Sequence, residues 1–247
     1  MILNSILFFI LCYHILWASF ELLVHRSLMH GHYTVDKKLA VVLRFIVWLL
    51  MGLAFKNWQQ HLCAQHRKHH RYSDQPEDPV SPHHQSFRQL FDYKHNEPGK
   101  PRYVGPEDIA MYAPEVVSDT SKLEIDFYQK YPNLGLNLTW VLYTVLFGLP
   151  GLIVGAIHRF LIIEIIILNA DYGTHKIGFR YVKLPYPDKA VNIFPIGILM
   201  AGEELHANHH LDPNRLNYAM RWFEFDLGYW YARFFISLGL MQVKGRR

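Results

Sequence analysis

Cysteine is scarce in this sequence: Cys12 and Cys63 are the only two among 247 residues. Two cysteines are too few for a disulfide framework or for an iron–sulfur cluster held by cysteine thiolates. No flavin- or nicotinamide-binding fingerprint is visible either. Any metal chemistry must therefore use nitrogen and oxygen ligands.

Charge is also scarce and unevenly placed. Charged residues make up 19% of the chain, against 51% hydrophobic residues. Residues 1–24 contain no Lys or Arg, and His158, Arg159 and Glu164 are the only charged residues or histidines within 135–168. Since about 20 apolar residues span a bilayer as a helix, we expect a membrane anchor that carries a polar cap.

The first apolar segment, residues 1–24, lacks the basic start and the small-residue cleavage site of a signal peptide. This predicts a retained anchor. Arg26 and Lys37 follow it, so the positive-inside rule places that end in the cytoplasm and the N-terminus outside. His14 is interpreted as a packing contact, whereas Glu21 suits either packing or a link to a site.

One pattern occurs twice: a histidine, two other residues and then a histidine pair. It is found at His66-Arg67-Lys68-His69-His70 and again at His206-Ala207-Asn208-His209-His210. Positions i, i+3 and i+4 share one face of a helix, so each box presents three imidazoles to one side. Neighbouring side chains point about 100° apart, which lets the two members of a pair serve two different metal ions.

A third pair, His25 and His30, is weaker evidence. Five residues turn a helix about 140° past a full circle. The two side chains therefore share a face only where the helix ends or distorts. By itself this spacing is more typical of two histidines at a membrane surface.

Residues 39–55 are apolar but short. If they crossed the bilayer, the His66 box would lie on the opposite side from His25 and His30, which a shared metal site forbids. We therefore expect this segment to lie in the membrane interface or to re-enter. The helix is expected to continue through Lys56-Asn57-Trp58 into the His66 box.

Residues 135–174 must then return to the same side, which predicts a helical hairpin with its turn between Gly148 and Arg159. Asp171 and His175, at i and i+4, share a face at the end of the last span.

With this path nine histidines emerge at one membrane face: His25, His30, His66, His69, His70, His175, His206, His209 and His210. Nine imidazoles exceed one tetrahedral zinc site and suffice for two larger ones. Imidazole suits iron, copper, zinc and nickel, and an open site beside a bilayer suggests oxygen chemistry on lipid.

The polar region between the boxes offers few further candidates. Asp74 and Asp78 are explained equally well as turn residues or as carboxylates that accept the second N–H of a ligating histidine. Residues 96–119 are typical of a surface loop or lid. His83, His84 and His95 are interpreted as solvated surface residues, and His61 as a surface or packing residue.

These segments resemble the membrane-bound acyl-chain desaturases, most closely their bacterial stearoyl-type (delta-9-like) branch. The resemblance runs from about His25 to Met241 and includes the three boxes, Asp171 to His175, and residues 221–230. Three boxes in this order are far more specific than one. The resemblance implies a non-haem di-iron enzyme that uses dioxygen and two reducing equivalents to introduce a cis double bond into a saturated acyl chain.

The expected fold is an all-α integral membrane protein, a single domain over 1–247 with three to four transmembrane helices, interfacial helices and a cytoplasmic helical cap. The expected parts are spans at 1–24 and 135–174, an interfacial or re-entrant helix at 39–55, and a cap formed by 56–134 and 175–247.

The resemblance also implies two iron ions, held by His25, His30, His66, His69, His70, Asp171, His175, His206, His209 and His210, with the nine histidines as the catalytic residues. The family usually has asparagine where Asp171 stands. A carboxylate there could ligate directly and favour a different iron potential or reaction. Because oxygen rebound onto the carbon competes with a second hydrogen abstraction, acyl hydroxylation and acetylene formation stay open.

The position of the double bond would be set by an apolar tunnel that orients the acyl chain. Aromatic residues could line it or anchor the protein at the bilayer surface: Trp48, Trp58, Trp140 and Tyr172.

The expected partners are a long-chain acyl substrate (acyl-CoA, acyl-ACP or phospholipid), the lipid bilayer of a bacterial inner membrane, and no nucleic acid. Electrons are expected from a separate ferredoxin- or cytochrome-type donor, which the net charge of +4 would attract. The rival hypotheses are a non-catalytic histidine-rich metal transporter and a haem protein. Both need polar or histidine residues inside the spans, where residues 3–20 offer few.

Overall fold

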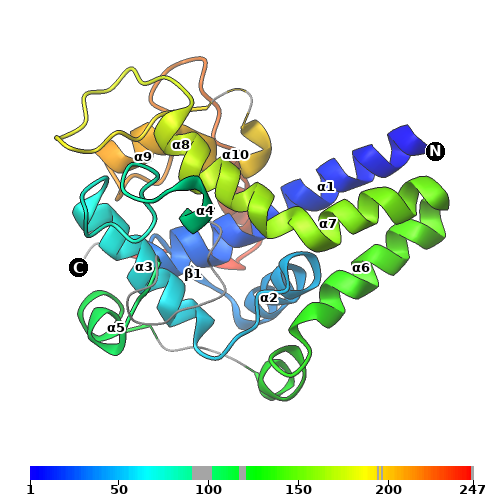
Figure 1. The fold of residues 1–247 in the computed structure, drawn as a ribbon. Helices are drawn as coiled ribbons and strands as arrows, with labels where there is room; N and C mark the ends of the chain where they lie inside the picture. The colour runs from blue at the N-terminus through cyan, green and yellow to red at the C-terminus, as the bar shows by residue number, and fades with distance from the viewer. Residues whose placement is uncertain (91–101, 117–120, 194, 196, 246–247) are drawn as a thin grey trace.

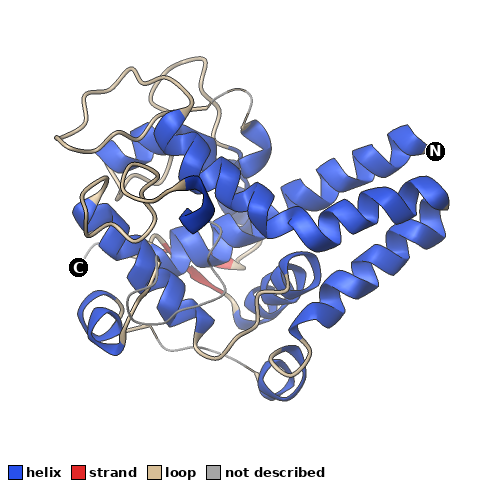
Figure 2. Ribbon diagram, in the orientation of Figure 1, coloured by secondary structure: helices blue, strands red, loops and turns tan. Residues whose placement is uncertain are grey.

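The computed structural model describes residues 1–90, 102–116, 121–193, 195 and 197–245. These form helices and one short pair of strands (Figures 1 and 2). The α-helices are α1 (Ile2–Phe20), α2 (Lys37–Met51), α3 (Trp58–Tyr72), α4 (Phe87–Leu90), α5 (Pro106–Tyr112), α6 (Pro132–Phe147), α7 (Leu149–Ile167), α8 (Thr174–Lys176), α9 (His206–Leu211) and α10 (Leu227–Ser237). The π-helical segments are η1 (Glu21–Met29), η2 (Glu124–Tyr128) and η3 (Leu168–Gly173), and the 3₁₀ turns are η4 (Ile198–Met200) and η5 (Glu203–Leu205). The strands are β1 (Tyr33–Val35) and β2 (Met241–Val243).

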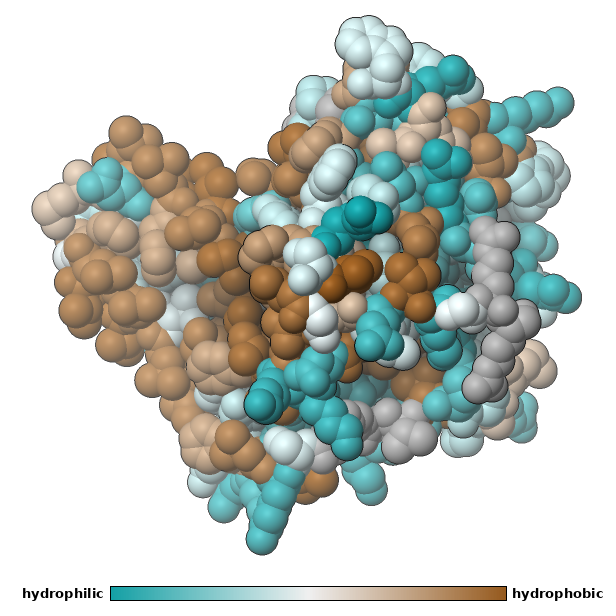
Figure 3. All heavy atoms as spheres, turned by 180° about the vertical axis from the view of Figure 1, so that it is seen from behind, coloured by the Kyte–Doolittle hydropathy of each residue, from teal (hydrophilic) through white to brown (hydrophobic). Residues whose placement is uncertain are grey.

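Helices α1, α6 and α7 project from the rest of the molecule as an arm (Figure 1). The N-terminus lies at the tip of the arm, where the Met1 side chain approaches Gly148 in the α6–α7 turn. The helices Ile2–Met29 and Leu149–Lys176 are each long and apolar enough to cross a membrane. Apolar side chains gather over the arm in Figure 3, while hydrophilic ones cover much of the remainder, called the cap below.

The predicted hairpin is present, and its turn falls at Gly148, within the predicted interval. Gly148 has φ 62°, a conformation that favours glycine. The two helices pack closely, because a Cβ on Gly151 would overlap the carbonyl oxygen of Tyr143. Helix α6 has 16 residues, which gives a rise of about 24 Å. It is therefore shorter than a hydrocarbon core of about 30 Å.

Helix α2 does not continue into α3, so the prediction of a helix through Lys56-Asn57-Trp58 is wrong. α2 ends at Gly52, which has φ 72° and whose N–H donates to the Trp48 carbonyl. After a non-helical connection, Asn57 has φ 58° and α3 begins at Trp58. The left-handed backbone at both residues ends the helical hydrogen-bond pattern, which periodicity alone does not reveal.

Helix α2 is held against the arm by small residues of α6. A Cβ on Gly135 would lie 2.5 Å from the carbonyl oxygen of Trp48. Thr139 Oγ1 donates to the Leu49 carbonyl at 3.0 Å. The base of the arm is therefore packed laterally by α2.

The fold is mostly helical, in line with the predicted all-α class, but it contains one short pair of strands that the sequence did not predict. β1 and β2 pair antiparallel, with Tyr33 opposite Val243 and Val35 opposite Met241. The ribbon joins the chain after the first histidine pair to the end of α10. Three-residue strands carry too short an alternation to be recognised in a sequence.

The predicted loop at 96–119 contains a helix in its described part. α5 begins at Pro106 and has Glu107 and Asp108 in its first turn, where acidic residues stabilise the helix dipole. The Asp108 carboxylate accepts from Lys68 Nζ at 3.0 Å and ties α5 to α3. Residues 91–101 and 117–120, and with them the prediction for His95, lie outside the described residues.

Candidate metal centre

His25 and His30 face the same way because the helix between them is distorted. In η1 the backbone N–H of His30 donates to the carbonyl of His25 at 3.1 Å. Such i+5 to i hydrogen bonds widen the turn and bring positions five apart onto one face. The Nε2 atoms of His25 and His30 lie 3.2 and 2.7 Å from Nε2 of His66. His25 and His30 therefore share a face because the helix is distorted between them, which is one of the two conditions stated in the sequence analysis.

Helices α3 and α9 complete this first group. His66 and His70 lie one turn apart on α3, with their Nε2 atoms 3.0 Å apart. His209 on α9 places its Nε2 atom 2.9 Å from Nε2 of His70. We call His25, His30, His66, His70 and His209 the five-histidine group.

The other histidines form a second group beside the first. His69 Nε2 lies 3.2 Å from His210 Nε2, and His175 Nε2 lies 3.0 Å from His206 Nε2. All four residues are buried. We call His69, His175, His206 and His210 the four-histidine group. The adjacent histidines of each box belong to different groups, as their angular separation predicts.

Two carboxylates accept hydrogen bonds from the Nδ1 atoms of imidazoles in the four-histidine group. His69 Nδ1–H donates to Asp78 at 2.8 Å, and His175 Nδ1–H donates to Asp74 at 3.0 Å. Of the two interpretations that the sequence left open for these aspartates, the structure shows the one in which each accepts an N–H from a histidine of the four-histidine group. Burial tends to raise the pKa of Asp74, but hydrogen bonds from His175 and Ser81 outweigh it and lower that pKa. Asp74 is therefore ionised at neutral pH.

Two further carboxylates were not singled out by the sequence. Asp188 accepts from His210 Nδ1–H at 2.7 Å. Glu203 reaches both groups, because one carboxylate oxygen lies 2.8 Å from His206 Nδ1 and the other lies 3.2 Å from His25 Nδ1. Every imidazole of the four-histidine group thus has a carboxylate beside its Nδ1 atom. For Glu203 the spacing of three residues before His206 was an available signal, whereas nothing in the sequence links Asp188 to His210.

The arrangement fits metal ions, because the Nε2 atoms face one another and each can present a lone pair to a bound ion. A neutral imidazole has one N–H and one lone pair, so an Nδ1–H directed at a carboxylate leaves the lone pair on Nε2. Burial, reinforced by neighbouring imidazoles, lowers the pKa of six of these histidines: His30, His66, His70, His206, His209 and His210. Metal ligation requires this neutral form. Octahedral bonds of about 2.1 Å place adjacent nitrogens about 3.0 Å apart, close to the separations of 2.7–3.2 Å found within the two groups.

His25 is held by a buried charge network at the end of α1. Its Nδ1 atom lies 2.8 Å from Glu21, which also accepts from Arg26 Nε at 3.0 Å. Arg26 is fully buried and donates to Asp226 at 2.8 Å. Gly202, with φ 111°, leaves room for this guanidinium, which a Cβ would overlap. Glu21 therefore belongs to the site, which settles the choice that the sequence left open.

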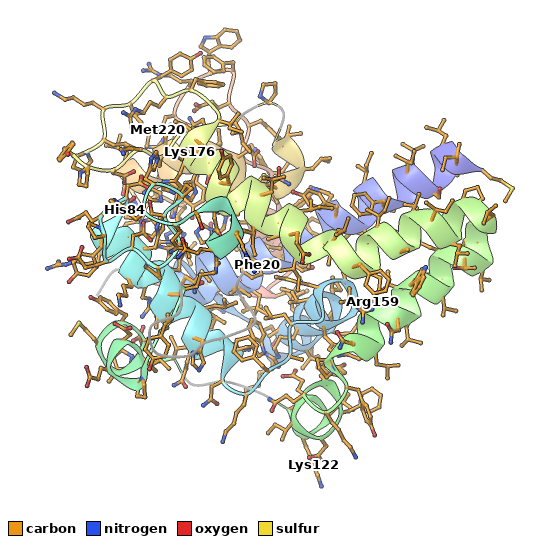
Figure 4. All side chains as sticks on the ribbon, viewed as in Figure 1. Phe20, His84, Lys122, Arg159, Lys176 and Met220 are labelled. Atoms are coloured by element: carbon orange, nitrogen blue, oxygen red, sulfur yellow. The ribbon has the colours of Figure 1, made fainter. Side chains whose placement is uncertain are left out.

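An apolar cavity of about 250 Å³ meets both groups. Its wall includes His25 and His66 of the five-histidine group, and His69, His175 and His206 of the four-histidine group. The remaining wall is mostly apolar and comes from α1, α7 and the α2–α3 connection, near Phe20 in Figure 4. A water-poor hydrocarbon space thus adjoins the candidate metal ligands.

The aromatic side chains on the cavity wall are Trp17, Phe20 and Phe55. They differ from the four that the sequence suggested. Trp48 and Trp58 are buried in the packed core, so they are not bilayer anchors either. Sequence position did not reveal which face of each helix the cavity meets.

Asp171 lies on the cavity wall with His175 but outside both histidine groups. Its carboxylate accepts from Arg102 Nη1 at 2.6 Å. Arg102 lines the same cavity, and no feature of the sequence indicated it. The carboxylate that departs from the family pattern therefore has a cationic partner.

The other histidines near the boxes have different environments. His83 is half-buried, and its Nε2–H donates to the carbonyl of His175 at 3.0 Å, so the prediction of a solvated residue is wrong. His84 is exposed, with Nε2 2.8 Å from the carbonyl of Asp74. His61 lies on the cavity wall.

A family model described as "Fatty acid desaturase" matches residues 3–236. The chain is 27% identical over 220 residues to hex-5-enoyl-[acyl-carrier protein] acetylenase of Moorena producens, covering 83% of this chain and 66% of the relative. It is 27% identical over 219 residues to sn-1 stearoyl-lipid 9-desaturase of Synechocystis sp., covering 87% and 64%. It is 25% identical over 249 residues to acyl-CoA Delta(11) desaturase of Spodoptera littoralis, covering 90% and 68%. The chain spans about two thirds of the length of these relatives.

Proposed function

Because this chain belongs to the fatty acid desaturase family, we propose that it is an oxygen-dependent di-iron desaturase that introduces a cis double bond into a long saturated acyl chain. The observation that carries the proposal is the apolar cavity, whose wall includes imidazoles of both histidine groups. An unactivated C–H bond in mid-chain is beyond the reach of any side-chain base. Bound irons would supply the dioxygen chemistry that breaks it.

The two histidine groups would hold the irons. The five-histidine group would hold one ion, and the four-histidine group would hold the other, with Asp171 as a further oxygen donor beside it. Asp74, Asp78, Asp188 and Glu203 would orient the rings through their Nδ1 atoms, which raises the basicity of the ligands. This division uses all nine histidines and both members of each histidine pair.

The protein's own contribution is orientation and exclusion of water. The apolar wall would hold two neighbouring methylene groups beside the imidazoles, an orientation effect worth several kcal/mol. Two hydrogens leave the acyl chain, and two electrons and two protons come from outside. One dioxygen is thereby reduced to two waters.

The membrane arrangement follows from the arm. We propose that α1, α6 and α7 enter the bilayer from one side and that α2 lies at the interface. The cap would then face the cytoplasm, at the inner membrane of a bacterium, where an acyl chain carried by CoA, ACP or a phospholipid can reach the cavity. An external electron donor completes the reaction.

Acetylene formation is the second candidate, because one relative is named as an acetylenase. It would start from an acyl chain that already has a double bond. The same ligands and cavity serve both reactions, so product analysis must separate them.

The test is gas chromatography with mass spectrometry of total fatty acids from a host that expresses the chain with an electron-donor system. A new monounsaturated acid, absent from the host alone, is the expected result. A hydroxy or acetylenic acid would move the assignment to the related reaction. No new acid despite membrane-inserted, iron-loaded protein and a working donor would contradict the proposal.

Replacing Asp171 with alanine is expected to lower the iron content from two ions per chain towards one. The reason is that the four-histidine group would lose its oxygen donor, while Arg102 would be left unpaired beside it. Iron per chain is measured by inductively coupled plasma mass spectrometry. Asp108→Ala is the matched control, because it also breaks an ion pair, with Lys68, outside both groups. Full iron occupancy and native activity in Asp171→Ala would remove this residue from the site.

Filling the cavity is expected to stop turnover without removing metal. Ala170 lines the cavity, and Ala170→Leu adds bulk that the acyl chain must displace, at a cost of about 1–3 kcal/mol. We expect about 5- to 150-fold less product with unchanged iron. Ala110→Leu, at an exposed position on α5, is the matched control. If the product level stays native in Ala170→Leu, the acyl chain does not occupy this cavity.

A further inference from the structure

Two aromatic side chains of the cap stand almost fully in solvent. Tyr186 lies in the loop between α8 and η4, and Trp222 lies between α9 and α10; each is 95% exposed. Figure 1 shows both loops along the upper edge of the cap, apart from the arm. Neither loop belongs to the apolar arm, so insertion of the arm into the bilayer does not explain this exposure.

The surface around these residues is basic. Besides Arg215, five exposed cations come from the same two loops and the adjoining end of α8: Lys176, Arg180, Lys183, Lys189 and Arg221. We call these five residues and Trp222 the basic face. In the described part of the two loops Asp212 is the exposed acid, while the other carboxylates are buried or half-buried. The imbalance of charge favours an anionic partner.

The two loops form one surface. Arg221 Nη2 donates to the carbonyl of Tyr181 at 3.4 Å, and its guanidinium lies 5.9 Å from the centre of the Tyr181 ring. The Tyr181 and Phe223 rings are 5.6 Å apart. Figure 4 places Lys176 and Met220 at the same end of the molecule, away from Arg159 and Lys122. The cations and the exposed tryptophan can therefore meet one partner together.

The inner side of the same loop contacts the candidate metal centre. Asp188 accepts from His210 Nδ1–H at 2.7 Å. The backbone N–H of Lys189 donates at 2.8 Å to Asp74, which holds His175. One loop thus separates solvent from two imidazoles of the four-histidine group.

We propose that the basic face docks a small acidic one-electron carrier protein and that electrons enter the metal site through the loop of Asp188. This inference rests on the proposed function, in which each double bond needs two electrons from outside. Two carriers would each lose one electron, and the acyl chain would lose two electrons and two protons. Together with two protons from solvent, these reduce one dioxygen to two waters.

Charge and exposed aromatic area would have different roles at this surface. The cations would steer an acidic carrier and speed association. Trp222 would supply the buried anchor that such interfaces use for affinity. An anionic membrane is the other conceivable occupant, but the face lies on the cap, outside the apolar arm that is proposed to enter the bilayer.

The test measures binding of an acidic [2Fe–2S] ferredoxin to the full-length, iron-loaded protein in phosphatidylcholine nanodiscs by surface plasmon resonance. We expect saturable binding that weakens steeply as the ionic strength rises from about 0.01 M to about 1 M, where the Debye length falls from about 30 Å to about 3 Å. Lys183→Glu with Arg221→Glu should raise Kd at least about tenfold. Lys122→Glu with Lys130→Glu makes the same change of charge on another exposed surface and should leave Kd unchanged. Trp222→Ala should also raise Kd.

Equal Kd values for the native protein and the Lys183/Arg221 variant would overturn the proposal, as would the absence of ferredoxin binding to the native protein. Loss of binding to phosphatidylglycerol vesicles with unchanged ferredoxin binding would assign the face to a membrane instead. Because binding is measured without turnover, it is independent of the reaction. Native ferredoxin binding without any new fatty acid would contradict the desaturase assignment and leave the docking face in place.

Discussion

Replacing His209 with alanine is expected to abolish formation of the unsaturated acid and to lower bound iron from two ions per chain towards one. The Nε2 atom of His209 lies 2.9 Å from that of His70, and its ring packs 4.5 Å from His30 and 4.7 Å from His25, measured between ring centres. Loss of a ligand should exceed the 10- to 100-fold effect typical of residues that only orient ligands. Product is measured by gas chromatography, and iron by plasma mass spectrometry on the purified protein.

His84→Ala is the control for His209→Ala. His84 is exposed on the same cap, outside both histidine groups, so its loss should change neither iron nor product. Native levels of both in His209→Ala would show that this group does not hold a catalytic metal.

Replacing Glu203 with glutamine is expected to weaken metal binding about 10- to 100-fold. One carboxylate reaches His25 in the five-histidine group and His206 in the four-histidine group. An amide has one acceptor oxygen, so it can serve one Nδ1–H and must present N–H to the other. Burial and the neighbouring Glu21 raise the pKa of Glu203 in the metal-free chain, and a bound cation would oppose that shift. Competition of the protein with an iron chelator measures the affinity.

Glu204→Gln is the matched control at the next residue. Burial raises the pKa of Glu204 to about 8, so the native side chain is mostly a neutral acid at pH 7. Its carboxyl accepts from the backbone N–H of Gly202 at 2.8 Å, a role that an amide oxygen can fill. Iron should stay in place in this variant. Equal chelator resistance in both variants would exclude the role assigned to Glu203.

Local periodicity predicted the parts of the site that depend on a single helix. The spacing in His66–His70 and His206–His210 determines which imidazoles share a face. The hairpin of residues 135–174 followed from its apolar length and from the requirement that His175 emerge on the same membrane face as the boxes. Asp78 could be proposed because it lies close in sequence to His69, from which it accepts a hydrogen bond. These features needed no knowledge of how distant segments pack.

What could not be predicted depends on contacts between distant segments or on local backbone geometry. Nothing in the sequence shows that Arg102 meets Asp171 or that Asp188 meets His210, since packing of separate loops brings each pair together. The break between α2 and α3 depends on left-handed backbone at Gly52 and Asn57. Glycine suggests such a conformation, but asparagine in a polar segment does not require it.

The π-helix η1 is an intermediate case. Regular helix geometry separates His25 and His30, so their pairing required a distortion that the sequence left conditional. The structure supplies the distortion, and Glu21 and Arg26 hold it through buried ion pairs. The spacing of His25 and His30 therefore supported only the prediction that they pair if the helix is distorted between them.

The central claim is that the nine histidines hold two irons beside an acyl cavity, and the metal content of the purified full-length protein tests it most directly. Plasma mass spectrometry combined with Mössbauer spectroscopy should find two irons per chain in two distinct nitrogen-rich environments. The sites should differ because each imidazole of the four-histidine group has a carboxylate partner. A single metal ion per chain, or iron replaced throughout by another metal in protein that forms the unsaturated acid, would contradict it.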